Sequence, residues 1–184
     1  EVFDDVRAVV QHWEQRQPDS SHARKQDYWH TEGNFDFLGV MLSNRRAAWR
    51  FQFFTRAFAC GIRKVCVMDA SPLEQTAVKA YVSTLPNPFP MVVADHEATV
   101  IGGQPVIFRH SDGPKPADGR VWVLWARANT GDAEVTLPVV RARVTVISVD
   151  GLKKSLEASG GHVHLNLKGD AKMAPGVLVV DRPS

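Results

Sequence analysis

Cysteine is scarce in this sequence, with only Cys60 and Cys66 among 184 residues. Two cysteines give no framework of several disulfides, the device that holds many small secreted domains together. We interpret both as buried thiols, because free cysteine is among the most buried residue types. A redox pair or a disulfide is the alternative. Neither interpretation decides the compartment, so the localisation stays unknown.

Strong net charge and long apolar runs are missing as well. The formal net charge is +2, and no basic run is clustered enough to attract a nucleic acid. No apolar stretch approaches the roughly 20 residues that a bilayer-spanning helix needs. No signal peptide is visible, although the sequence opens inside a predicted helix, so an upstream segment would hide one. We expect neither a nucleic-acid partner nor a membrane partner.

What is present is the composition of a folded protein, 44% hydrophobic and 23% charged. The length suits one ordinary domain or two small ones. Three prolines between Leu85 and Pro90 make a stiff connector that stops helix formation. We therefore predict one domain at residues 1–90 and a second at residues 91–184.

The first 90 residues alternate predicted helices and strands. Apolar residues at helical spacing predict helices near residues 2–14, 45–60 and 71–84, and two β-prone runs begin at Tyr28 and Ile62. Ser71, Pro72 and Glu74 have the spacing of a capping box. This order predicts parallel strands joined by right-handed crossovers. A solvated helix face, rather than an anion site, is our interpretation of the four arginines at positions 45, 46, 50 and 56.

The second half changes to short strands separated by glycine-rich turns. Nine strands are predicted, at residues 91–94, 98–101, 106–110, 121–126, 134–137, 144–149, 152–157, 162–167 and 177–180. Asp150-Gly151 is the best two-residue hairpin turn. Many short strands at this spacing predict an antiparallel β-sandwich.

Two pairs of side chains in this half are candidates for a functional role. Trp122 and Trp125 are predicted to be core residues, with a sugar-stacking platform at Trp125 as the alternative. His162 and His164 share one face of their strand. We interpret them as part of an exposed strand face, because no third ligand is evident for a metal-chelating pair.

The segment from Tyr28 to Asn34 is the candidate site. Tyr, Trp and Thr favour a strand, whereas Gly33 and Asn34 end one. Because side chains alternate along a strand, Tyr28, His30 and Glu32 share a face. Glu32 then lies at the carboxyl end of the strand, where α/β barrels carry their chemistry. The alternative is that Glu32 only caps the following loop or pairs with an arginine.

The whole order resembles the C-terminal part of a retaining glycoside hydrolase of clan A. Trp29-His30-Thr31-Glu32-Gly33 looks like the seventh-strand motif of that clan, and Ile62 to Met68 looks like its eighth strand. Residues 120–125 and 144–156 look like strands of the accessory sandwich of such enzymes. The resemblance implies the C-terminal portion of a (β/α)8 TIM barrel, strands seven and eight, followed by an antiparallel β-sandwich that braces it.

The same resemblance implies a function. Glu32 would be the nucleophile of a double displacement that cleaves O-glycosidic bonds, and His30, Asn34, Asp36 and Asp69 would bind the carbohydrate substrate. The acid/base Glu of the family commonly follows an Asn, and this chain has no Asn-Glu pair. We expect that group to come from a missing N-terminal barrel portion, a separate chain or a lost segment, so the chain alone should be inactive. No cofactor and no metal are expected.

Two alternatives from other classes stay open. One is a non-catalytic carbohydrate-binding or scaffold subunit. The other is a different barrel enzyme, such as a lyase or an aldolase. The second is weakened because Lys64 lies at the amino end of its strand and makes a poor Schiff-base lysine.

Overall fold

The computed structural model describes residues 28–30, 43–65, 70–88, 91–93, 97–169 and 174–183. Its first part contains two short strands and two helices: β1 (Tyr28–His30), α2 (Ser43–Ala59), β2 (Ile62–Val65) and α3 (Pro72–Thr84). Nine strands follow: β3 (Met91–Val93), β4 (Thr99–Gly102), β5 (Pro105–Ser111), β6 (Arg120–Ala126), β7 (Ala133–Pro138), β8 (Arg143–Ser148), β9 (Lys153–Glu157), β10 (His162–Leu167) and β11 (Val177–Asp181). Each of the nine predicted strands of the second half has its counterpart.

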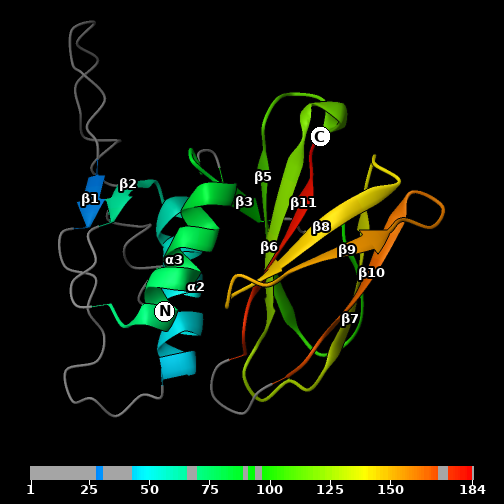
Figure 1. Ribbon diagram of the computed structural model, residues 1–184. Helices are drawn as coiled ribbons and strands as arrows, with labels where there is room; N and C mark the ends of the chain where they lie inside the picture. The colour runs from blue at the N-terminus through cyan, green and yellow to red at the C-terminus, as the bar shows by residue number, and fades with distance from the viewer. Residues whose placement is uncertain are drawn as a thin grey trace, which may run out of the picture.

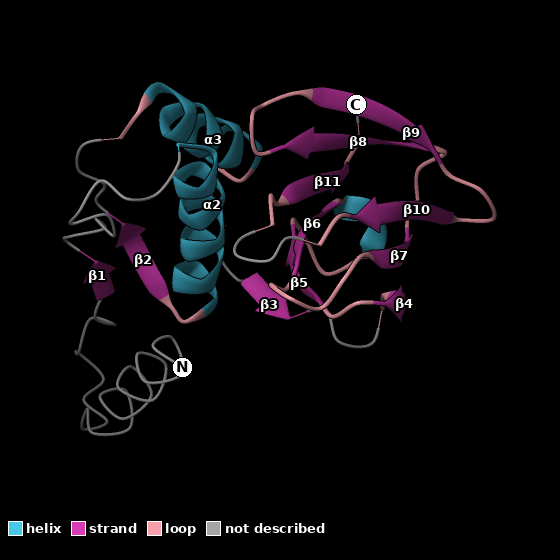
Figure 2. Ribbon diagram, turned by 90° about the horizontal axis from the view of Figure 1, so that it is seen from below, coloured by secondary structure: helices cyan, strands magenta, loops and turns pink. Residues whose placement is uncertain are grey.

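These nine strands form two antiparallel sheets. The larger has the order β3-β5-β6-β11-β8-β9 (Figure 1), and the smaller has the order β10-β7-β4 (Figure 2). The predicted hairpin at Asp150-Gly151 is confirmed: it joins β8 to β9, and Gly151 has a φ of 82°, which favours glycine. The two sheets bury a shared core, so the predicted β-sandwich agrees with the structure.

Every residue of strand β6 is buried, which shows that β6 lies at the centre of the molecule. Side chains alternate along a strand, so its residues divide between two cores. Trp122 and Leu124 face the core between the two sheets, together with Val135 and Leu137 of β7. Val123 and Trp125 share the opposite face of β6 and belong to the other core. A strand that is apolar on both faces needs a cover on both sides.

Helices α2 and α3 provide the second cover (Figure 2). The stripe Ala47, Phe51, Phe54 and Phe58 of α2 has helical spacing and lies in one core with Tyr81 of α3. That core also contains residues of β5, β6, β8 and β11, namely Phe108, Val121, Val123, Trp125, Ile147 and Leu178. The described molecule therefore has three layers: a helical pair, a six-stranded sheet and a three-stranded sheet.

The prediction that the first part is the C-terminal portion of a (β/α)8 TIM barrel is wrong. The described strands are mostly antiparallel, and the parallel pairing in the described part is limited to the short strands β1 and β2. The physical reason lies in the aromatic stripe of α2. It predicts a buried face correctly, but that face packs with α3 on a sheet of the sandwich instead of in a barrel wall.

Two further predictions concern the domain boundary and membrane-spanning helices. The domain boundary between residues 90 and 91 stays a prediction, although one core contains side chains from both sides of it. In the described part of the chain, neither helix is long and apolar enough to cross a membrane.

Candidate active site

The parallel pair β1–β2 is the feature that positions the predicted site. In its register Tyr28 is opposite Ile62, Trp29 is opposite Lys64 and His30 is opposite Val65, with an irregularity between Tyr28 and Trp29. Parallel strands end at the same edge of their sheet. His30 and Val65, the last residues of β1 and β2, therefore lie at the same edge.

Of the five predicted site residues, only His30 lies in the described part, as the last residue of β1. The structure describes its backbone and not its side chain. Glu32, Asn34, Asp36 and Asp69 lie outside the described residues. The roles assigned to them stay predictions.

Glu74 is the centre of a buried ionic cluster between α2 and α3. Its side chain is 2% exposed and accepts hydrogen bonds from the backbone N–H of Ser71 at 2.9 Å and from Arg50 Nε at 2.8 Å. Arg46 Nη2 lies 3.0 Å from the second carboxylate oxygen. Glu74 Oε2 and the Ser71 hydroxyl complete the predicted capping box at the start of α3. The cluster thus joins the N-terminal half of α2 to the first turn of α3.

The charge on Glu74 is stabilised by these donors. Burial alone raises the pKa of a carboxyl group, but the hydrogen bonds from Ser71 and Arg50 outweigh it and hold the pKa of Glu74 below its ordinary value. Glu74 is therefore an ionised structural group and not a proton donor at neutral pH.

The solvated helix face predicted for the arginines is wrong for Arg50, which is 2% exposed. Arg56 is also partly buried, with its guanidinium 5.6 Å from the centre of the Trp125 ring, a cation–π distance. The sequence signal for this burial was that Arg46 and Arg50 lie next to the apolar stripe at Ala47 and Phe51. Periodicity alone did not separate a buried ion pair from an exposed face.

The tryptophans of β6 are core residues, as predicted. Trp122 is 0% exposed and Trp125 is 2% exposed. Trp125 stacks on Phe108 with their ring centres 5.8 Å apart. Among the Phe, Tyr and Trp side chains that the structure describes, Trp49 is half-buried and all the others are buried.

Two polar links on the sandwich were not found from the sequence. Arg182, directly after β11, forms two bonds to Asp112, from Nε to Oδ2 at 2.5 Å and from Nη2 to Oδ1 at 2.6 Å. It also donates to the backbone carbonyl of Thr84 at the end of α3. In the second link, the 1% exposed carboxylate of Asp181 accepts the backbone N–H of Val140 at 2.8 Å. Both are long-range contacts that no local pattern indicates.

The comparisons with known proteins add information about the fold. No family model matches this sequence, and no curated protein matches it. A solved structure, that of N2152 from Neocallimastix frontalis, is similar to this chain with a TM-score of 0.52 and 10% sequence identity. The match covers 99% of this chain and 50% of the other, so this chain spans about half the length of that protein. The likeness concerns the fold alone.

Proposed function

We propose that this chain contributes the nucleophile of an enzyme that hydrolyses O-glycosidic bonds by double displacement, and that Glu32 is that nucleophile. The observation that supports the proposal is the parallel register of β1 and β2, with His30 opposite Val65. Glu32 follows His30 by two residues and Asp69 follows Val65 by four. The proposal places Glu32 near the shared edge, because a chain of two residues spans at most about 7 Å.

The chemistry requires two carboxyl groups with different roles. In a retaining glycosidase one carboxylate attacks the anomeric carbon, and a second carboxyl group about 5–5.5 Å away protonates the leaving oxygen. Glu32 has the first role here, and the acid/base comes from residues outside these 184. Asn34, Asp36 and Asp69 bind sugar hydroxyls, and His30 donates to the substrate or to the nucleophile. The chain alone then forms the covalent intermediate from an activated substrate but does not turn over.

The sandwich in this proposal braces the site from a distance. Its six-stranded sheet packs against α2, the first described element after β1, and against α3, which follows β2. A non-catalytic carbohydrate-binding subunit is the competing function. The burial of Trp122 and Trp125 speaks against sugar binding on the sandwich through these rings.

Burst kinetics with activated aryl glycosides test the proposal. A dinitrophenolate leaving group needs no protonation, so the attack of Glu32 can be followed without the acid/base. Across a panel of dinitrophenyl glycosides, at least one sugar should release one equivalent of dinitrophenolate per chain in a burst. Glu32→Gln should abolish the burst, whereas Glu134→Gln, at an exposed position of β7, should retain it. A burst that survives in Glu32→Gln contradicts the proposal, and so does no burst with any sugar of the panel.

A further inference from the structure

Strand β10 presents two histidines on the outer face of the three-stranded sheet. His162 and His164 are both exposed, whereas Val163 between them is 1% exposed and faces the core. The regular antiparallel pairing of β10 with β7, with His162 opposite Pro138 and His164 opposite Thr136, fixes this alternation. The two imidazoles therefore rise from the same face of one rigid strand.

Hydrogen bonds orient both rings. His162 Nδ1 lies 2.9 Å from the carbonyl oxygen of Gly160. A carbonyl oxygen only accepts, so Nδ1–H is the donor, and in the neutral imidazole Nε2 then has the free lone pair. His164 Nδ1 lies 2.9 Å from Thr136 Oγ1, a hydroxyl oxygen that can accept a hydrogen bond from Nδ1–H. Metal-binding histidines commonly show this pattern, in which one ring nitrogen is held by an oxygen and the other faces the metal.

The spacing along the strand suits one shared ion. Residues two apart in a strand are separated by about 6.6–6.8 Å, and each imidazole nitrogen binds zinc at about 2.0–2.1 Å. Imidazole side chains that rise from such positions on one strand face can turn toward one common ion. Imidazole nitrogen suits Zn²⁺, Ni²⁺ and Cu²⁺, with Cu²⁺ bound most tightly among divalent first-row ions.

We propose that His162 and His164 form a surface site that chelates one divalent transition-metal ion. Among the described residues no group of three or more His, Cys, Asp or Glu side chains is placed to hold a metal ion. Water therefore completes the coordination, and the site is an open two-imidazole chelate and not a closed structural centre. The site is independent of the proposed nucleophile, which lies in a different part of the chain.

Titration of the full chain, prepared without a polyhistidine tag, with Cu²⁺ alone tests this site. Calorimetry should give one Cu²⁺ per chain, and the electron paramagnetic resonance spectrum should show coupling to two imidazole nitrogens. His162→Asn and His164→Asn should each weaken binding roughly tenfold or more, and the double variant should abolish it. Ser155→Ala, exposed on β9, is the control and should bind as the unaltered chain does.

Three results would overturn the site. They are no Cu²⁺ binding by the unaltered chain, unchanged affinity in either single variant, or full binding by the double variant. The last would assign the ion to the other five histidines, which the double variant retains. Because the two positions are exposed, the variants should fold, and circular dichroism of each variant checks this.

Discussion

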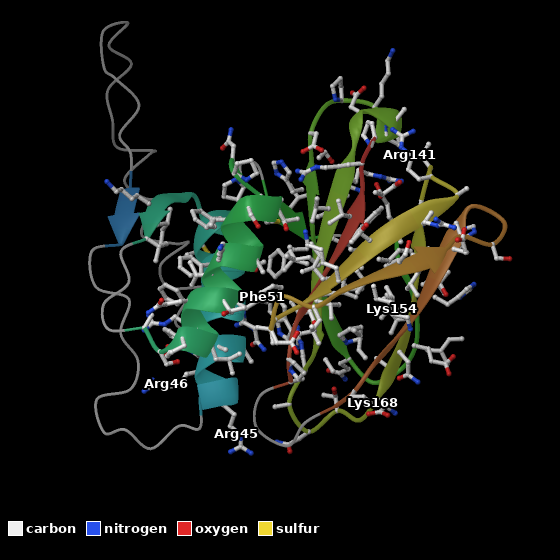
Figure 3. All side chains as sticks on the ribbon, in the orientation of Figure 1. Arg45, Arg46, Phe51, Arg141, Lys154 and Lys168 are labelled. Carbon is white, nitrogen blue, oxygen red and sulfur yellow. The ribbon has the colours of Figure 1, made fainter. Side chains whose placement is uncertain are left out.

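The ring of Phe51 covers Gly176 so closely that a methyl group in place of the glycine hydrogen would lie 2.3 Å from Phe51 Cε1. Phe51 belongs to α2, and Gly176 directly precedes β11. Figure 3 shows Phe51 between the helical pair and the sandwich. Two parts of the chain that are 125 positions apart thus meet without space for a side chain, and α2 lies directly against the start of β11.

This contact gives a first prediction. Gly176→Ala should lower the free energy of unfolding by about 1–3 kcal/mol, because the buried Phe51 ring has to shift. In a Phe51→Leu background the added methyl group has more space, so the further loss from Gly176→Ala should be smaller. Denaturant melts of the four chains measure the coupling. Equal losses in the two backgrounds would show that the ring does not cover the glycine.

The ion pair of Arg50 and Glu74 gives a second prediction. Arg50→Met leaves a buried carboxylate with fewer donors and should cost roughly 3 kcal/mol. Replacing both residues by Met should cost less than the sum of the single losses, since no buried charge then remains unpaired. Arg143→Met breaks an exposed pair with Glu157 and should cost less than about 1 kcal/mol. Similar losses for Arg50→Met and Arg143→Met in urea titrations would contradict the burial of the cluster.

The Asp112–Arg182 contact predicts a pH dependence of stability. The hydrogen bonds from Arg182 hold the pKa of Asp112 below its ordinary value of 3.8. A group with a lowered folded-state pKa stabilises the fold fully above its unfolded-state pKa, and the effect is lost as the pH falls through the folded-state pKa. Asp112→Asn should therefore reduce stability by about 1 kcal/mol at pH 7. Below the folded-state pKa the difference should vanish, and a constant difference from pH 7 to strongly acidic pH would contradict this account.

The core shared by the helices and the sheet predicts the behaviour of residues 91–184 alone. Without α2 and α3, the apolar face that contains Phe108 and Trp125 loses its cover. The isolated segment should bind the dye ANS and melt less cooperatively than the full chain. A sharp melt without dye binding would instead support two independent domains divided at residue 90.

Much of the local structure could be predicted from the sequence. The nine strands after residue 90, the capping box at Ser71 and the turn at Gly151 depend on neighbouring residues, and all are present. The position of the helices could not be predicted. An apolar stripe shows that one face of α2 is buried, but it does not show which surface covers that face. The buried face of α2 was therefore predicted correctly, whereas its packing in a barrel was wrong.

The candidate site also has features that the sequence predicts and features that it does not. The strand at Tyr28 and its parallel pairing with β2 followed from residue types and element order. The buried position of Arg50 did not, because the partner that neutralises it is 24 positions away. Polar links of this length depend on how the helices pack, which local patterns do not encode.

Mechanism-based labelling tests the role of Glu32 most directly. The chain is treated with a panel of 2-deoxy-2-fluoro glycosides that carry a dinitrophenolate leaving group, and its peptides are mapped by mass spectrometry. Fluorine at C2 slows the hydrolysis of a glycosyl-enzyme, so the covalent intermediate accumulates. We predict a glycosyl group on the peptide that contains Glu32 and none in Glu32→Gln. A label on another carboxylate, or no label with any sugar, would contradict the account.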